Sequence, residues 1–165
     1  MNLKLFSSCL ALVLGAGVGY ALDVYAQAKP EVLIKQRLAV MVLHGKYWGP
    51  LGAMASGKAP YNAEVVARNA GFLDALSQMP WDGFQPSTKD EKTNALPAIY
   101  EDPTKFKEAQ DRYRGAIGKL VAASKGGDEG AFKAVAGEVG KSCGGCHQSF
   151  RVPLKEMQNF FYNPR

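Results

Sequence analysis

The sequence predicts an all-α protein, an antiparallel four-helix bundle, and three observations support this fold class. No segment of the 165 residues alternates apolar and polar side chains long enough to indicate a strand. Four stretches instead repeat apolar residues every three or four positions, as amphipathic helices do. Short links at two junctions and one longer connection suit helices that pack as antiparallel neighbours.

The first predicted helix begins at residues 29–31. Proline at position 30 suits a first helical turn, and Glu31 suits the positive end of a helix. Its apolar stripe contains Ile34, Leu38, Met41, Gly45, Trp48 and Gly52. Pro50 is expected to kink or end this helix, because proline removes a backbone donor.

The second predicted helix spans about residues 62–78. Asn62 is a suitable N-cap, because its side chain can accept from a free backbone N–H. The expected buried face contains Val65, Phe72, Leu76 and Met79.

The third and fourth helices are marked by their caps. Asp102 precedes a proline and predicts the start of the third helix, which should end at the glycine pair 126–127. The fourth helix should begin near Asp128 and end before Pro153. Residues 79–101 contain three prolines and predict a long loop.

Composition limits the class of protein. Hydrophobic residues make up 47% and charged residues 21%, which fits one packed domain and excludes a disordered chain. Three cysteines are too few for a disulfide-based scaffold. The net charge of +5 is not by itself a nucleic-acid signature, and no phosphate loop or hydrolase motif is present.

Residues 1–28 read as a cleavable signal peptide. Lys4 precedes an apolar core at residues 10–19, and small residues permit cleavage after Ala26 or Ala28. This predicts a periplasmic protein with no membrane segment in its mature form, whereas an uncleaved anchor is the alternative. The expected organisation is a signal peptide at 1–28, a four-helix domain at 29–152 and a tail at 153–165.

The segment Cys143-Gly144-Gly145-Cys146-His147 matches C-x-x-C-H, the attachment pattern of c-type haem. On a helix these cysteines and the histidine share one face, at positions i, i+3 and i+4. Two thiols can then form thioethers with one haem, and His147 can bind the iron from the same side. The motif therefore predicts one covalent haem c, held by Cys143 and Cys146, with His147 as proximal ligand.

Other interpretations of these cysteines fit less well. A redox C-x-x-C pair normally lies at a helix N-terminus beside strands, whereas this one lies late in a helix. A structural zinc ion needs about four ligands, and the mature chain offers no suitable spacing. A structural disulfide would leave the following histidine unexplained.

The exported chain, with its single haem motif near the C-terminal end, resembles the class II c-type cytochromes, and within them the cytochromes c prime. The supporting segments are 29–31, the spacing of Arg37 and Met41, 57–61, 80–84 and 143–151. The resemblance implies a homodimeric bundle with pentacoordinate iron. It also implies that Arg37 lies near a haem propionate, that Met41 covers the distal face, and that Arg151 lies beside the proximal histidine.

The sixth position of the iron has competing interpretations. Methionine sulfur is a competent haem ligand, so Met41 can give a low-spin electron-transfer cytochrome instead of an open site. His44 lies three residues further on and can approach the same face, which allows bis-histidine ligation. A peroxidase built on His44 and Arg37 ranks last, because a true distal histidine–arginine pair is missing.

The expected function follows from an open iron. It is the binding of nitric oxide or carbon monoxide together with one-electron redox chemistry, without enzymatic turnover. The third helix is basic and can dock an acidic redox partner. Its basic residues are Lys105, Lys107, Arg112, Arg114 and Lys119.

Overall fold

The structure is a computed structural model that describes residues 28–153, 155 and 156. Within these residues the named elements are all helical, which confirms the predicted fold class. The elements are α2 (Pro30–Ala55), α3 (Ala63–Leu76), η1 (Trp81–Gly83), η2 (Pro86–Thr88), α4 (Ala98–Glu101), α5 (Pro103–Ser124) and α6 (Glu129–Phe150).

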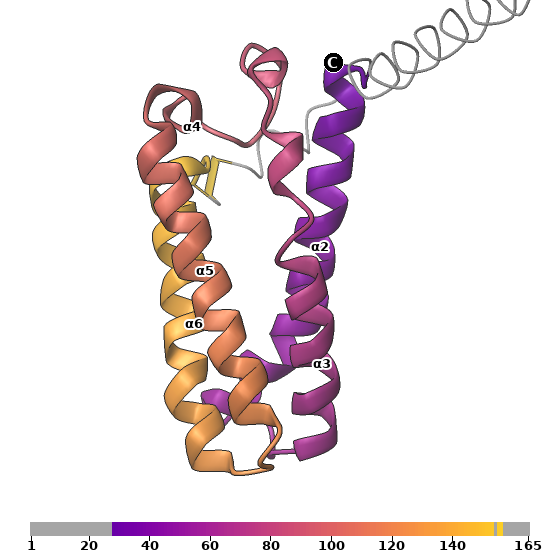
Figure 1. The fold of residues 1–165 in the computed structure, drawn as a ribbon, viewed down its shortest axis with the longest axis vertical. Helices are drawn as coiled ribbons and strands as arrows, with labels where there is room; N and C mark the ends of the chain where they lie inside the picture. The colour runs from indigo at the N-terminus through magenta and orange to yellow at the C-terminus, as the bar shows by residue number, and fades with distance from the viewer. Residues whose placement is uncertain (1–27, 154, 157–165) are drawn as a thin grey trace, which may run out of the picture.

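The four long helices lie side by side and alternate in direction (Figure 1). Helix α2 packs on α3 and α6, while α5 packs on α3 and α6. The connections α2–α3 and α5–α6 are short and lie at one end of the bundle. The long α3–α5 connection carries η1, η2 and α4 and covers the other end, where α6 also finishes.

The predicted helix starts are confirmed by their caps. The side chain of Asn62 accepts from the Val65 N–H at 2.9 Å, and Asp102 accepts from the Lys105 N–H at 3.0 Å. Asp128 caps α6 in the same way. Each cap satisfies a backbone donor that has no partner inside its helix.

The structure corrects the expected helices in detail. Of the two outcomes expected at Pro50, an end of the first helix is excluded, because α2 continues to Ala55. In the expected buried face of the second helix, Leu76 is buried and Val65 packs on the core, whereas Phe72 is exposed and so is Met79, which lies beyond the end of α3. The other buried residues of α3 are Val66, Asn69, Ala70 and Leu73. The 79–101 connection is not an irregular loop throughout, because it contains two 3-10 turns and α4.

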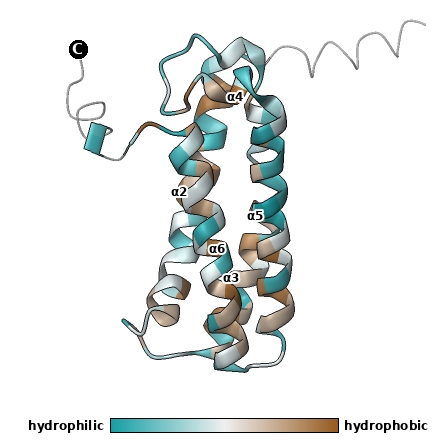
Figure 2. Ribbon diagram, turned by 90° about the vertical axis from the view of Figure 1, so that its left-hand side faces the viewer, coloured by the Kyte–Doolittle hydropathy of each residue, from teal (hydrophilic) through white to brown (hydrophobic). Residues whose placement is uncertain are grey.

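The core has two neighbouring parts. The larger one joins all four long helices around side chains such as Leu51, Leu73, Ile117 and Phe132. The smaller one gathers Ile99, Phe106, Ala109 and Phe150 near the end of α6. Figure 2 shows hydrophilic residues along much of α5 and around α4.

No helix in the described part of the chain is long and apolar enough to cross a membrane.

The predicted signal peptide lies almost entirely outside the described residues, as does most of the tail from 153 to 165. Both assignments therefore stay predictions.

Candidate haem site

The C-x-x-C-H motif occupies the last two turns of α6. Cys143 and Cys146 are free thiols, each partly buried, and His147 is partly buried beside them. Cys143 packs on the larger core and Cys146 on the smaller one, so the motif faces inward where the two parts meet. The helical spacing predicted from the sequence is therefore confirmed.

Burial controls the protonation of these groups. It raises the pKa of both thiols, although Arg112 and Arg151 oppose the rise at Cys146. Burial also lowers the pKa of His147, and the charges of Arg151 and His44 lower it further. The His147 imidazole is thus favoured in its neutral form, which has the lone pair that a metal ligand requires.

Arg37 is only 2% exposed, although its guanidinium is permanently charged. It donates from Nη1 to the carbonyl oxygen of Gly83 at 3.0 Å and to Thr88 Oγ1 at 3.1 Å. Nη2 donates to Thr93 Oγ1 at 2.9 Å, and the guanidinium lies 4.5 Å from the centre of the Phe84 ring. All of these partners are neutral.

This arrangement leaves Arg37 ready for an anion. A guanidinium has five N–H donors, and the three hydrogen bonds use three of them. A buried charge is expensive unless an opposite charge accompanies it. The two remaining donors match the fork geometry that carboxylates accept, so this site fits a carboxylate group.

His44 faces the motif from α2. Its Nδ1 lies 2.8 Å from the carbonyl oxygen of Val40, and its charge acts on His147. A carbonyl can only accept, so Nδ1 carries the hydrogen and Nε2 has a lone pair. Nε2 is buried without a partner among the described residues. Met41, one turn after Arg37, is partly buried on the same helix.

Aromatic rings from three elements form a wall next to the motif. Trp81 and Phe84 of the long connection, Phe106 and Tyr113 of α5, and Phe150 of α6 contact one another with ring centres 5.0–6.4 Å apart. Trp81 is held in place because its Nε1 donates to the Ser77 carbonyl oxygen at 2.7 Å. Such a wall suits a flat apolar group.

The long connection also holds the end of α6. The Leu96 N–H donates to the Phe150 carbonyl oxygen, and the Val152 N–H donates to the Asn94 carbonyl oxygen, both at 2.9 Å. Arg151 lies between these two bonds, and its Nε is buried without a partner among the described residues. Its charge acts on both Cys146 and His147.

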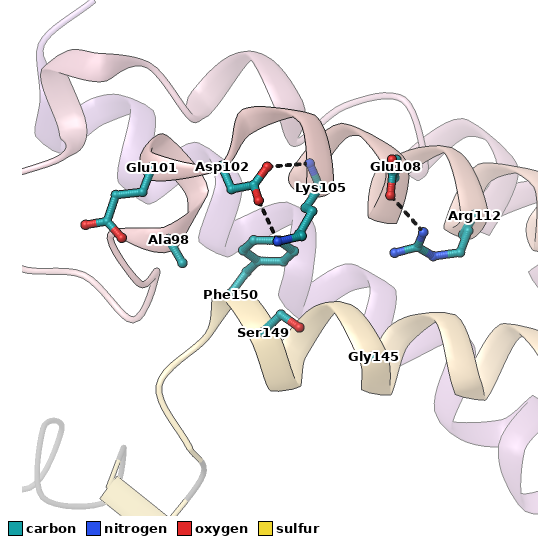
Figure 3. Close-up of a pocket in the computed structure, with 9 residues that line it drawn as sticks. All are labelled: Ala98, Glu101, Asp102, Lys105, Glu108, Arg112, Gly145, Ser149 and Phe150. Carbon is teal, nitrogen blue, oxygen red and sulfur yellow. Dashed lines mark hydrogen bonds and ion pairs between the residues drawn. The ribbon is translucent and has the colours of Figure 1, made fainter.

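A separate groove of about 460 Å³ lies between α4, α5 and the outer side of α6 (Figure 3). Two ion pairs cross its wall, Lys105–Asp102 at 2.8 Å and Arg112–Glu108 at 3.6 Å. Of the motif, only Gly145 lines it. The groove is therefore distinct from the inward face that carries the thiols and His147.

The residues present fit a covalent haem. Two thiols and a neutral imidazole share one helix face, an apolar aromatic wall lies next to them, and a buried guanidinium has donors left for a carboxylate. Three buried polar atoms near the motif, on His44, Tyr113 and Arg151, also lack partners in the described part of the chain. Fold and site together define a four-helix c-type cytochrome.

Comparison with known proteins agrees. The family model described as Cytochrome C' matches residues 32–151. Cytochrome c' of Rubrivivax gelatinosus is 41% identical over 124 residues, which cover 74% of this chain and 96% of that protein. Cytochrome c' of Alcaligenes xylosoxydans xylosoxydans is 37% identical over 124 residues, which cover 75% of this chain and 96% of that protein. The chain belongs to the cytochrome c' family, whose cofactor is covalent haem c.

Solved structures support the same assignment. The crystal structure of the Rubrivivax gelatinosus protein aligns with a TM-score of 0.72 and 40% identity, covering 75% of this chain and 98% of that one. A nitric oxide complex of a variant of the Alcaligenes xylosoxidans protein aligns with a TM-score of 0.70 and 36% identity, covering 76% and 98%. A carbon monoxide complex of another variant of that protein aligns with a TM-score of 0.71, with the same identity and coverage.

The structure adds residues that the sequence analysis did not select. Thr88, Thr93 and the Gly83 carbonyl surround Arg37, and Asn94 binds the segment after the motif. No local sequence signal indicates these contacts, because each joins positions that are distant in the chain. Tyr113 could be expected in the core from its helical stripe, but its unpartnered hydroxyl could not.

Proposed function

We propose that the mature chain is an exported cytochrome that binds nitric oxide and carbon monoxide at an open iron and exchanges single electrons. Cys143 and Cys146 form the two thioethers, and His147 is the only protein ligand of the iron. When bound, haem c supplies an iron that changes between ferrous and ferric states and takes a diatomic gas as ligand. The observation that carries the proposal is the inward face of α6, where both thiols and a neutral imidazole meet the aromatic wall.

Other residues of the chain hold and shield the group. Arg37 would pair with a propionate, since its free donors suit a carboxylate. Met41 would cover the distal face and restrict access to small ligands. Arg151 would lie beside His147 and bias the strength of its bond to iron through its charge. No step needs a residue that transfers a group to a substrate, so the role is binding and electron exchange without enzymatic turnover.

Two further properties belong to the proposal. The segment 1–28 would direct the chain to the periplasm and then be removed. The mature protein would be a homodimer, for which several exposed apolar side chains on α2 and α3 offer a surface. They are Val32, Leu38, Val42, Leu43 and Phe72. Light scattering on the purified mature protein measures the oligomeric state.

Optical spectra of the purified protein test the open iron. We expect a high-spin reduced spectrum that changes when carbon monoxide is added. Sharp low-spin bands that resist carbon monoxide would refute it and would indicate that Met41 or His44 binds the iron. In the variant His147→Ala, both thioethers should still form while the iron spectrum changes. An unchanged spectrum would show that the proximal assignment is wrong.

A further inference from the structure

We infer that His44 and Tyr113 form a complementary hydrogen-bonding pair beside the iron, and that this pair admits small protic ligands such as hydrosulfide in addition to diatomic gases. This inference rests on the proposed function, because it requires an accessible sixth position. It concerns two buried polar atoms near the motif, and the ligand pocket is the space that we propose beside them.

His44 offers only an acceptor to this pocket. Its ring hydrogen is used in the bond from Nδ1 to the Val40 carbonyl oxygen, 2.8 Å away on the preceding turn. Nε2 therefore has a lone pair and no hydrogen, and it is buried without a partner in the described residues. Burial lowers the pKa of His44, which favours this neutral form. In its protonated form His44 would lower the pKa of His147, which indicates that the two rings lie near each other.

Tyr113 offers a donor to the same pocket. The side chain is 8% exposed, and its hydroxyl is buried without a partner in the described residues. Burial raises the pKa of this phenol, so the hydroxyl keeps its hydrogen. Cys143 acts electrostatically on Tyr113, which places the ring beside the first thiol of the motif. The centres of the Tyr113 and His44 rings are 5.5 Å apart.

The two atoms do not satisfy each other, because both lack a partner. A buried polar group without a hydrogen bond costs free energy, so a ligand that pairs with both is favoured over one that pairs with neither. Hydrosulfide has a hydrogen on its coordinating atom for Nε2 and lone pairs for the hydroxyl. The cyanide anion, which predominates above the pKa of hydrogen cyanide, has lone pairs but no hydrogen, so in titrations at such an alkaline pH it can use Tyr113 only.

Equilibrium titrations of the ferric holoprotein with hydrosulfide and cyanide, at one fixed pH, separate the two roles. One net hydrogen bond corresponds to a change in Kd of about tenfold. We expect His44→Leu to weaken hydrosulfide binding by about that factor and to change cyanide binding by less than about twofold. Tyr113→Phe should weaken both ligands by a similar factor. Tyr61→Phe is the matched control, because it also removes a buried unpartnered hydroxyl, but one that packs on Phe132.

Other outcomes overturn the inference. If His44→Leu changes both ligands equally, or neither, His44 only packs. If Tyr113→Phe behaves like Tyr61→Phe, the hydroxyl has no role. If both ligands bind more tightly in His44→Leu and the parent protein is low-spin, His44 itself binds the iron. Carbon monoxide distinguishes this inference from the proposed function. If the ferrous parent protein and ferrous His44→Leu both fail to bind carbon monoxide, the proposal of an open iron is wrong. If both bind carbon monoxide normally but the substitutions do not separate hydrosulfide from cyanide, only the inference about His44 and Tyr113 is refuted.

Discussion

Replacement of Arg37 by methionine is the perturbation that most directly tests how the site is held. The guanidinium is 2% exposed and joins α2 to the long connection through Gly83, Thr88 and Thr93. Methionine keeps the length of the side chain but donates no hydrogen bond. The substitution therefore removes three hydrogen bonds at once and leaves one carbonyl and two hydroxyls with fewer partners.

The expected magnitude follows from the three buried hydrogen bonds. Hydrogen bonds from a charged donor contribute about 1.5–3 kcal/mol each, and they are not additive. We therefore expect the free energy of unfolding to fall by about 3–5 kcal/mol, less than the sum of the three. With a urea dependence of about 2 kcal/mol/M, the midpoint should fall by roughly 2 M.

Urea unfolding of the holoprotein, followed by far-ultraviolet circular dichroism, measures this loss. Arg114→Met is the matched control, because Arg114 is less buried than Arg37, donates one 3.4 Å hydrogen bond to the Ser77 carbonyl oxygen, and lies 5.7 Å from the centre of the Trp81 ring. Arg114→Met should lower the free energy of unfolding by less than about 1 kcal/mol. If Arg37→Met costs no more than Arg114→Met, the buried contacts of Arg37 do not hold the connection in place.

The reduction potential gives the second half of this test. Removing a positive charge near the iron favours the ferric state, so the potential of Arg37→Met should fall while that of Arg114→Met changes less. A loss of stability with an unchanged potential would mean that Arg37 braces the long connection without pairing with a propionate.

Three further substitutions test the bundle, each by urea unfolding of the holoprotein. Asn62→Ala removes the N-cap of α3 and should lower the free energy of unfolding by about 1 kcal/mol, whereas Asn62→Asp should retain most of the stability. Leu120→Ala empties a fully buried position and should cost about 2–5 kcal/mol, and a smaller loss would mean that the core closes over the cavity. Gly127→Ala places a side chain at φ +66° and should cost about 1 kcal/mol, while no loss would show that the turn relaxes.

Much of the fold could be predicted because its signals are local. Capping side chains and a glycine pair mark the helix ends within a few residues, and the structure confirms them at Asn62, Asp102 and Asp128. The motif on α6 is local as well. Pro50 does not end α2, because packing outweighs the backbone preference of proline. Leu51 and Met54 follow it and are buried, so tertiary contacts stabilise the last turn.

The buried face of α3 could not be selected from apolar residues alone. Phe72 fits the expected stripe but is 44% exposed, where its ring packs on Tyr47. Asn69 is polar but 2% exposed, because its amide donates to the Tyr47 carbonyl oxygen on α2. Two apolar stripes were thus possible, and the hydrogen bond of Asn69 to α2 accompanies the one that contains Val66, Ala70 and Leu73.

Distance along the chain also decides which parts of the site could be predicted from the sequence. The thiols and His147 are adjacent on one helix, so their spacing alone brings them together. Arg37 is different, because its burial depends on Thr88, whose hydroxyl donates to the Gln85 carbonyl oxygen and accepts from both Arg37 and Tyr100. The contact between Arg37 and Thr88 spans 51 positions along the chain.

The long connection is therefore a structural part of the site as well as a crossover between α3 and α5. Thr93 accepts from Arg37 on α2, and the next residue, Asn94, accepts from the backbone after Arg151 at the end of α6. Two adjacent residues thus fix the cations that flank the site from opposite helices. The α2 side and the α6 side of the site therefore contact the same short segment, one through a threonine hydroxyl and the other through backbone.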